Sequence, residues 1–79
     1  MSDAIPGVGE GRRIDARGLL CPWPALRLGR AAREMANSGK VIIVADDPIA
    51  PRELQSLCDE RGWSIREAGE PNAFEVEFG

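Results

Sequence analysis

Hydrophobic and polar residues alternate along the chain with periods that predict four strands and two helices. Residues 41–45 form a continuous run of Val, Ile, Ile, Val and Ala, which is typical of a strand buried on both faces in the middle of a sheet. Residues 63–67 and 74–78 each alternate with a period of two, and the turn-forming residues between them predict a hairpin. Residues 13–16 form a shorter strand candidate near the start of the chain.

Residues 22–36 have the period of an amphipathic helix. At about 100° per residue, apolar residues gather on one side of this helix and charged residues on the other. The apolar side consists of Pro24, Ala25, Leu28, Ala31, Ala32, Met35 and Ala36. Asn37 or Gly39 suits the left-handed position that ends such a helix. The apolar side should face the core.

A second helix is predicted after the buried strand. Asp47 followed by Pro48 is a helix-start signal, because the carboxylate can accept backbone N–H bonds and proline fits the first turn. The helix should run to about residue 61, where a glycine follows. Cys58 and Leu54 share its apolar face, so we expect Cys58 to be a small buried hydrophobe.

The predicted elements follow the order βαβαββ. This order predicts an α/β fold, a two-layer α/β sandwich in which a mixed sheet carries both helices on one face. Charged alternates such as Glu75 and Glu77 should turn to water on the other face. Residues 1–11 are turn-rich and aperiodic, so we expect a flexible tail there and a single domain over residues 12–79.

Length and composition fit one globular domain. The chain has 79 residues, of which 43% are hydrophobic and 29% are charged, and no run approaches the roughly 20 apolar residues that cross a bilayer. No export signal is visible, so we expect a cytoplasmic protein with reduced thiols and no membrane contact. A pI near 4.9 argues against direct nucleic-acid binding, which depends on a surplus of Lys and Arg.

The residue types that are missing exclude several kinds of catalysis. The chain has no histidine and two cysteines, too few for a structural zinc site with four Cys or His ligands. Without histidine, the usual Cys-His and Ser-His nucleophile pairs cannot form. A reactive cysteine in this chain must therefore be activated in another way.

Cys21 stands in the sequence GLLCPWP, directly ahead of the first predicted helix. Pro22 is the residue type preferred at the first helical position, so the thiol should lie at or just before the N-cap. The positive end of the helix dipole and the nearby Arg17 are expected to lower the pKa of Cys21 and to favour its thiolate. Gly18 supplies a turn position, and Pro22 and Pro24 stiffen the first helical turn.

Trp23 and Leu26 fall on the charged side of this helix, together with Arg27 and Arg30. Two interpretations fit the apolar pair: a docking surface for a protein partner beside Cys21, or a first-turn tryptophan that folds back over the edge of the core. The arginines could draw in an acidic partner or form a solvated helix surface.

Residues 14–24, with the sequence IDARGLLCPWP, resemble the Cys-Pro-x-Pro signature of the TusA/SirA-like sulfur-carrier family. Asp46-Asp47-Pro48, with Cys58 ten residues further on, resembles the second motif of that family, and the match spans about residues 13–78. The resemblance implies that Cys21 accepts sulfane sulfur from a cysteine desulfurase or a rhodanese-type donor. It further implies that Cys21 holds this sulfur as a persulfide and passes it to a downstream acceptor protein.

The same resemblance implies a sulfurtransferase. Sulfur transfer between cysteines requires neither a nucleotide nor a metal, so we expect no cofactor. We expect the protein to be a monomer when free. The relay is best known for 2-thiouridine formation in tRNA and is also used in sulfur oxidation and cofactor assembly. This chain has Glu53-Leu54-Gln55 where many tRNA-thiolating members have Asp-Ile-Pro, whereas its double aspartate fits TusA proper.

Two other functions fit the residues. In the first, the chain is an interaction or regulatory module in which the CPWP sequence is only a rigid helix start. In the second, Cys21 and Cys58 form a redox switch, although no Cys-x-x-Cys motif supports it. Replacing Cys21 with serine separates the three, because only a carrier depends on that thiol alone.

Overall fold

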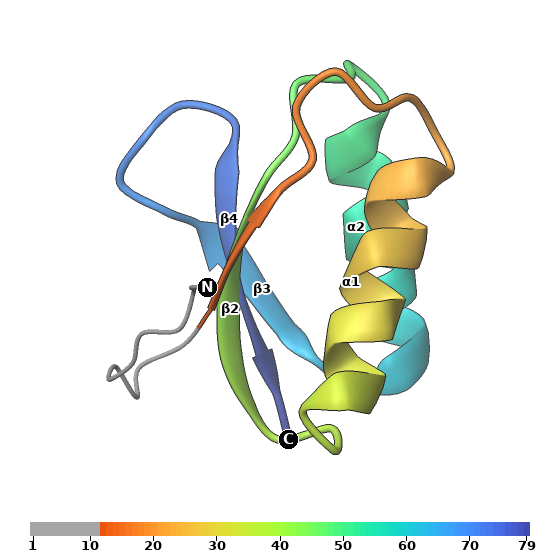
Figure 1. Ribbon diagram of the computed structural model, residues 1–79, viewed down its shortest axis with the longest axis vertical. Coiled ribbons are helices and arrows are strands. Elements are labelled where there is room, and N and C mark those ends of the chain that lie inside the picture. Colours follow the sequence, from red (N-terminus) through yellow and green to blue (C-terminus); the bar gives the residue numbers. More distant parts are fainter. Residues whose placement is uncertain (1–11) are drawn as a thin grey trace.

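The computed structural model describes residues 12–79, which fold into two layers (Figure 1). The elements along the chain are β1 (Arg12–Asp15), α1 (Trp23–Glu34), β2 (Gly39–Val44), α2 (Ala50–Arg61), β3 (Ser64–Glu67) and β4 (Ala73–Phe78). Both helices cover one face of a four-stranded sheet. The predicted βαβαββ sandwich is confirmed, while the predicted tail at residues 1–11 lies outside the described residues.

The sheet is mixed, with strand order β1-β2-β4-β3. Strands β1 and β2 are parallel and pair Ile14 with Ile43, whereas β4 runs antiparallel to both of its neighbours. The parallel pair requires a crossover, which α1 supplies, and the antiparallel pair β3–β4 is the predicted hairpin. As neighbouring parallel strands, β1 and β2 end at the same edge of the sheet, so the loops that follow them meet there.

The core lies between the helices and the sheet. On the helices it is formed by small and branched residues, namely Leu28, Ala31, Ala32, Ala50, Leu54 and Cys58. Facing them are the sheet residues Ile14, Val41, Ile43, Val76 and Phe78. The apolar side predicted for the first helix is confirmed except at its end, because α1 stops at Glu34 and leaves Ala36 exposed.

The far face of the sheet corrects one expectation. Residues 41–45 were expected to be buried on both faces, but Ile42 is only half-buried because neither helix of residues 12–79 covers that side. Its partner on β4 is Glu75, which forms ion pairs with Lys40 at 3.0 Å and Arg66 at 3.2 Å. Glu77 is exposed, as the alternation predicts.

Helix ends follow local chemistry, with small shifts from the sequence prediction. Asn37 adopts a left-handed φ of 57° after α1, and Gly62 does so at 77° after α2, where a residue without Cβ is least strained. Helix α2 begins at Ala50, later than the Asp47-Pro48 signal, because the Asp47 carboxylate accepts the Ile49 N–H in a turn that precedes the helix. Neither helix in residues 12–79 is long and apolar enough to cross a membrane.

Candidate functional site

Cys21 is exposed in the loop between β1 and α1, which we call the Cys21 loop, residues 16–22. The N-cap of α1 is Pro22, so Cys21 lies just before the cap, as predicted. The peptide bond between Cys21 and Pro22 is cis. In Figure 1 this loop lies at the same end of the molecule as the loop between β2 and α2, which carries the second motif.

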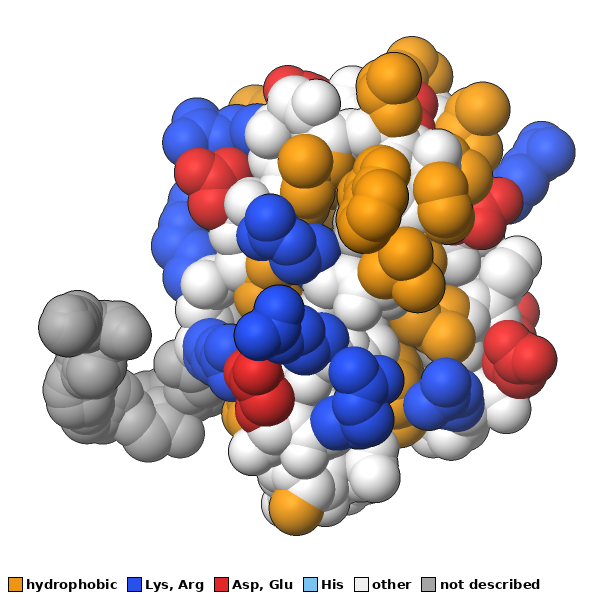
Figure 2. All heavy atoms as spheres, turned by 45° about the vertical axis from the view of Figure 1, so that its right-hand side comes forward, with side chains coloured by type: hydrophobic (Ala, Val, Ile, Leu, Met, Phe, Trp, Pro, Cys, Tyr) orange, Lys and Arg blue, Asp and Glu red, His pale blue; other side chains and the backbone are white. Residues whose placement is uncertain are grey.

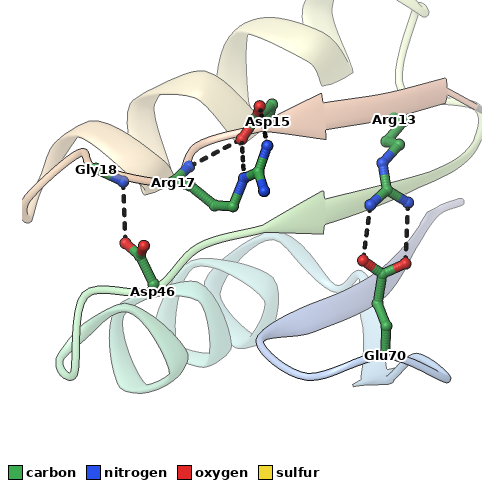
Figure 3. A network of polar contacts seen from close by, with 6 residues as sticks. All are labelled: Arg13, Asp15, Arg17, Gly18, Asp46 and Glu70. Atoms are coloured by element: carbon green, nitrogen blue, oxygen red, sulfur yellow. Dashed lines mark hydrogen bonds and ion pairs between the residues drawn. The ribbon is translucent and has the colours of Figure 1, made fainter.

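Asp46 and Asp47, the aspartate pair, hold the Cys21 loop through its backbone. The Cys21 N–H donates to Asp47 Oδ2 at 2.7 Å. The Gly18 N–H donates to Asp46 Oδ1 at 2.9 Å, as Figure 3 shows. Asp47 is only 8% exposed and also accepts the Ile49 N–H at 3.2 Å. The two motifs, which are 26 residues apart, therefore form one site. Pro48 is exposed in the turn that follows Asp47.

Few donors remain at the start of α1. Pro22 and Pro24 have no N–H, and the Trp23 N–H donates to the Leu20 carbonyl at 2.8 Å. The Cys21 N–H is taken by Asp47, so among the described residues the Ala25 N–H is the first one of the helix without a backbone acceptor. The start of α1 therefore offers a sulfur anion fewer free N–H groups than the four found at the start of an ordinary helix.

Arg17 does not provide the predicted support for a thiolate. Its guanidinium donates twice to Asp15, from Nε to Oδ1 and from Nη2 to Oδ2, both at 2.9 Å (Figure 3). This pairing lowers the pKa of Asp15 and raises that of Arg17. The neighbouring Gly18 has a φ of 82°, in agreement with its predicted role as a turn residue.

The pKa of Cys21 is raised, which contradicts the expectation of a lowered value. The largest cause is desolvation of the thiol, followed by the negative charges of Glu53 and Asp47 and a hydrogen-bonding contact with Glu53. The expectation is wrong because Arg17 is paired with Asp15 and the Cys21 N–H is bonded to Asp47. The remaining charges that act on the thiol are the carboxylates of Asp47 and Glu53, which are negative. The thiol is therefore the resting form at neutral pH.

Exposed apolar side chains lie on the segments that flank this thiol and Asp47. Four large ones form what we call the apolar patch: Leu20 at 67% exposure, Trp23 at 57%, Leu26 at 54% and Ile49 at 52%. Hydrophobic side chains gather at one end of the face seen in Figure 2, above a band of Lys and Arg. Trp23 thus does not fold over the core, and of the two interpretations the structure favours the exposed one.

Arginines of α1 extend the site away from the patch. Arg27 and Arg30 are exposed on this helix, and Arg30 forms an ion pair with Glu34 at 3.1 Å. Glu34 also pairs with Arg12 of β1 at 2.7 Å, whereas Arg27 has no ion-pair partner within residues 12–79. Arg27 is therefore an unpaired cation next to Leu26 of the apolar patch.

Comparison with known proteins identifies the family. The model of the family described as "Sulfurtransferase TusA" matches residues 12–78. The chain belongs to the TusA sulfurtransferase family. A solved structure of a SirA-like protein from Desulfitobacterium hafniense is similar, with 28% sequence identity and a TM-score of 0.69. The match covers 84% of this chain and 92% of that one, which confirms the fold and the family resemblance.

The second cysteine of this TusA-family protein is separate from the site. Cys58 is 0% exposed on the core face of α2, and burial raises its pKa to about 11. It forms no disulfide with Cys21. Its predicted burial is confirmed, and an inaccessible thiol of this kind does not fit a redox switch.

Two residues of the site were missed by the sequence reasoning. Glu53 enters the sequence analysis only as a departure from a family motif, although its negative charge, from the first turn of α2, helps to raise the pKa of Cys21. The Asp47-Pro48 signal places Ile49 at the start of the second predicted helix and gives it no other role, but its side chain is exposed in the apolar patch. The available signal was that both motifs follow neighbouring parallel strands, whose ends meet at one edge of the sheet.

Proposed function

We propose that this protein is a sulfur carrier that holds sulfane sulfur on Cys21 as a persulfide and relays it to an acceptor protein. Membership of the TusA family supports the sulfurtransferase activity. The observation that carries the choice of residue is that Cys21 is the exposed cysteine, held by Asp47 between Leu20 and Trp23 of the apolar patch.

Loading and unloading are thiol–persulfide exchanges. The Cys21 thiolate attacks the terminal sulfur of the donor persulfide, a new S–S bond forms at Cys21, and the donor cysteine leaves as a thiolate that takes up the proton lost from Cys21. An acceptor thiolate then attacks the terminal sulfur on Cys21, and the Cys21 thiolate leaves. Neither step changes the overall oxidation state, so the relay needs no nucleotide, metal or other cofactor.

The partners are a cysteine desulfurase or rhodanese-type donor and a downstream acceptor protein, for which tRNA 2-thiouridine synthesis is one destination. Trp23 and Leu26 supply the apolar contact for docking, and Arg27 and Arg30 draw in an acidic surface of the partner. The chain itself need not touch tRNA. We place the relay in the cytoplasm, where thiols are kept reduced.

The test is intact-protein mass spectrometry of the reduced protein after incubation with a cysteine desulfurase and cysteine. Persulfidated rhodanese serves as a second donor, and Cys21→Ser and Cys58→Ser are measured in parallel. A reductant-labile gain of one sulfur is expected in the wild type and in Cys58→Ser, and none in Cys21→Ser. If neither donor loads the wild type, the relay is wrong.

The raised pKa of Cys21 favours a second candidate, an interaction module whose apolar patch binds a partner without chemistry at the thiol. Such a module keeps its partner in Cys21→Ser and loses it in Trp23→Ala. A carrier loses sulfur transfer in the first of these variants even when the partner still binds.

A further inference from the structure

Strand β1 forms one edge of the sheet. It pairs with β2 alone, in the strand order β1-β2-β4-β3. The Ala16 N–H, just after β1, donates to the Val44 carbonyl at 2.8 Å and so points toward β2. Because the backbone groups of successive strand residues point to alternate sides, the N–H and C=O groups of Arg13 and Asp15 point away from β2. None of these four groups has a hydrogen-bond partner within residues 12–79.

A groove of about 390 Å³ lies between this strand and α1. It is lined by all four residues of β1 and, from α1, by Arg27, Arg30, Ala31 and Glu34. The side chains of Arg13 and Asp15 are exposed, so solvent reaches the part of the strand whose backbone points outward. An extended segment that paired with this edge would add a fifth strand to the four-stranded sheet and would lie along the groove.

The groove is basic although the protein is acidic. Four arginines and two acids line it, so its net charge is +2, whereas the whole chain has a net charge of −3. Arg12 and Arg30 share a single carboxylate, that of Glu34, at 2.7 Å and 3.1 Å. Arg27 forms no ion pair within residues 12–79. The positive charge that is left over favours an anionic ligand.

Backbone and charge together point to an acidic segment as the occupant. Alternate side chains of a strand point to the same face, so every second side chain of an added strand would face α1. Acidic side chains at those positions would meet Arg27 and Arg30, which are three residues apart, or about 4.5 Å along the helix axis. A second copy of this chain fits poorly, because it would bring another groove with a charge of +2 against this one.

We propose that the β1 edge binds an extended acidic segment of another protein by strand addition. The backbone of the segment pairs with the N–H and C=O groups of Arg13 and Asp15, and its carboxylates pair with the arginines of the groove. Charged side chains on an edge strand discourage pairing with other strands, so the arginines here oppose basic segments and admit acidic ones. This binding goes beyond the proposed carrier function, because no step of it involves the thiol of Cys21.

The probe is a fluorescein-labelled heptapeptide of alternating threonine and glutamate, titrated with the full chain at low salt and followed by fluorescence anisotropy. We expect this peptide to bind and the matching threonine–lysine peptide not to bind. Arg27→Gln should weaken binding about fivefold, the loss of one exposed ion pair at the upper end of its usual range. Arg33→Gln is the matched control, since it removes the same charge from an exposed position of α1 outside the groove, and it should change the affinity by less than about twofold.

Amide hydrogen exchange measured by NMR reports the backbone pairing. In the free protein the N–H groups of Arg13 and Asp15 should exchange fast, whereas that of Ala16, which is bonded to Val44, should exchange slowly. Saturating acidic peptide should slow exchange at Arg13 and Asp15 severalfold, because the added strand then accepts hydrogen bonds from both groups.

Absence of binding to the acidic peptide would overturn the inference, and so would binding that leaves exchange at Arg13 and Asp15 unchanged. An equal loss of affinity in Arg27→Gln and Arg33→Gln, with both variants folded by circular dichroism, would also refute it, since the effect would then be one of net charge. Tighter binding of a heptauridylate than of the acidic peptide would assign the groove to single-stranded nucleic acid instead. Sulfur loading of Cys21 uses neither probe, so failure of the carrier function is distinguishable from failure of this binding.

Discussion

Replacing Asp47 with alanine is predicted to destabilise the protein more than its single side chain suggests. The substitution leaves two backbone groups without their acceptor: the Cys21 N–H, now bonded at 2.7 Å, and the Ile49 N–H, now bonded at 3.2 Å. A hydrogen bond to a charged group contributes roughly 1.5–3 kcal/mol. The first bond is short and partly buried while the second is long, so we expect a loss of about 2–3 kcal/mol in the free energy of unfolding.

That loss is large enough to measure. For a domain of this length, each kcal/mol shifts the Tm by roughly 4–8 °C, so Asp47→Ala should melt roughly 10–20 °C below the wild type in circular dichroism. Asp46→Ala is the matched control, because it removes a single bond, to the Gly18 N–H, from an exposed carboxylate that water can replace. We expect this control to lose less than about 1 kcal/mol.

Asp47→Asn separates charge from shape, because its amide oxygen can still accept one bond, and it should fall between the other two variants. A melting temperature of Asp47→Ala within about 3 °C of the wild type would refute the reasoning, and so would equal losses in Asp46→Ala and Asp47→Ala. Sulfur loading of Cys21, measured where all variants are folded, should be slower in Asp47→Ala than in Asp47→Asn, since both remove the charge but only the alanine releases the loop that positions the thiol.

Three further predictions concern other parts of the molecule. Burial raises the pKa of Cys58 to about 11 from an ordinary value of 9.0, so the unfolded chain loses this proton first. The resulting stability is complete below pH 9 and is lost as the pH rises toward 11, by up to about 2–3 kcal/mol; urea midpoints should show this loss in the wild type and not in Cys58→Ala. Gly62→Ala should cost about 1 kcal/mol because φ is 77° there, whereas Gly29→Ala, inside α1 with open space around it, should stabilise by about 0.5–1 kcal/mol in the same assay. Trp23→Ala should leave the Tm within a few degrees, because the side chain is 57% exposed, yet reduce sulfur loading from a protein donor several-fold; an unchanged loading rate would remove Trp23 from the docking surface.

The sequence was sufficient to predict the order of the elements and most of the core. Helix and strand periods are local signals, and the burial of Leu28 and Cys58 followed from their spacing alone. The half-exposed Ile42 was not predictable in this way, because a continuous apolar run looks the same whether helices cover one face of the strand or both.

The charge around Cys21 was beyond the reach of local reasoning. A helix start and a nearby arginine suggested a lowered pKa, but this inference assumed that both were free to act on the thiol. Arg17 is neutralised by Asp15, two residues away, and the Cys21 N–H is bound by an aspartate 26 residues further along the chain. Whether a positive group stabilises a thiolate depends on which other groups already pair with that positive group. Only the folded chain shows those partners.

Parallel pairing of β1 with β2 explains why the two motifs meet. Asp15 pairs in register with Val44, the last residues of the two strands, so the loops that follow them leave the same edge of the sheet side by side. Had β2 been antiparallel to β1, the aspartate pair would lie at the opposite edge, and the Cys21 loop would have no carboxylate to hold its backbone. The same juxtaposition brings Glu53 to the thiol. The contact that fixes the position of Cys21 and the negative charges that add to the effect of desolvation on its pKa therefore share one structural origin.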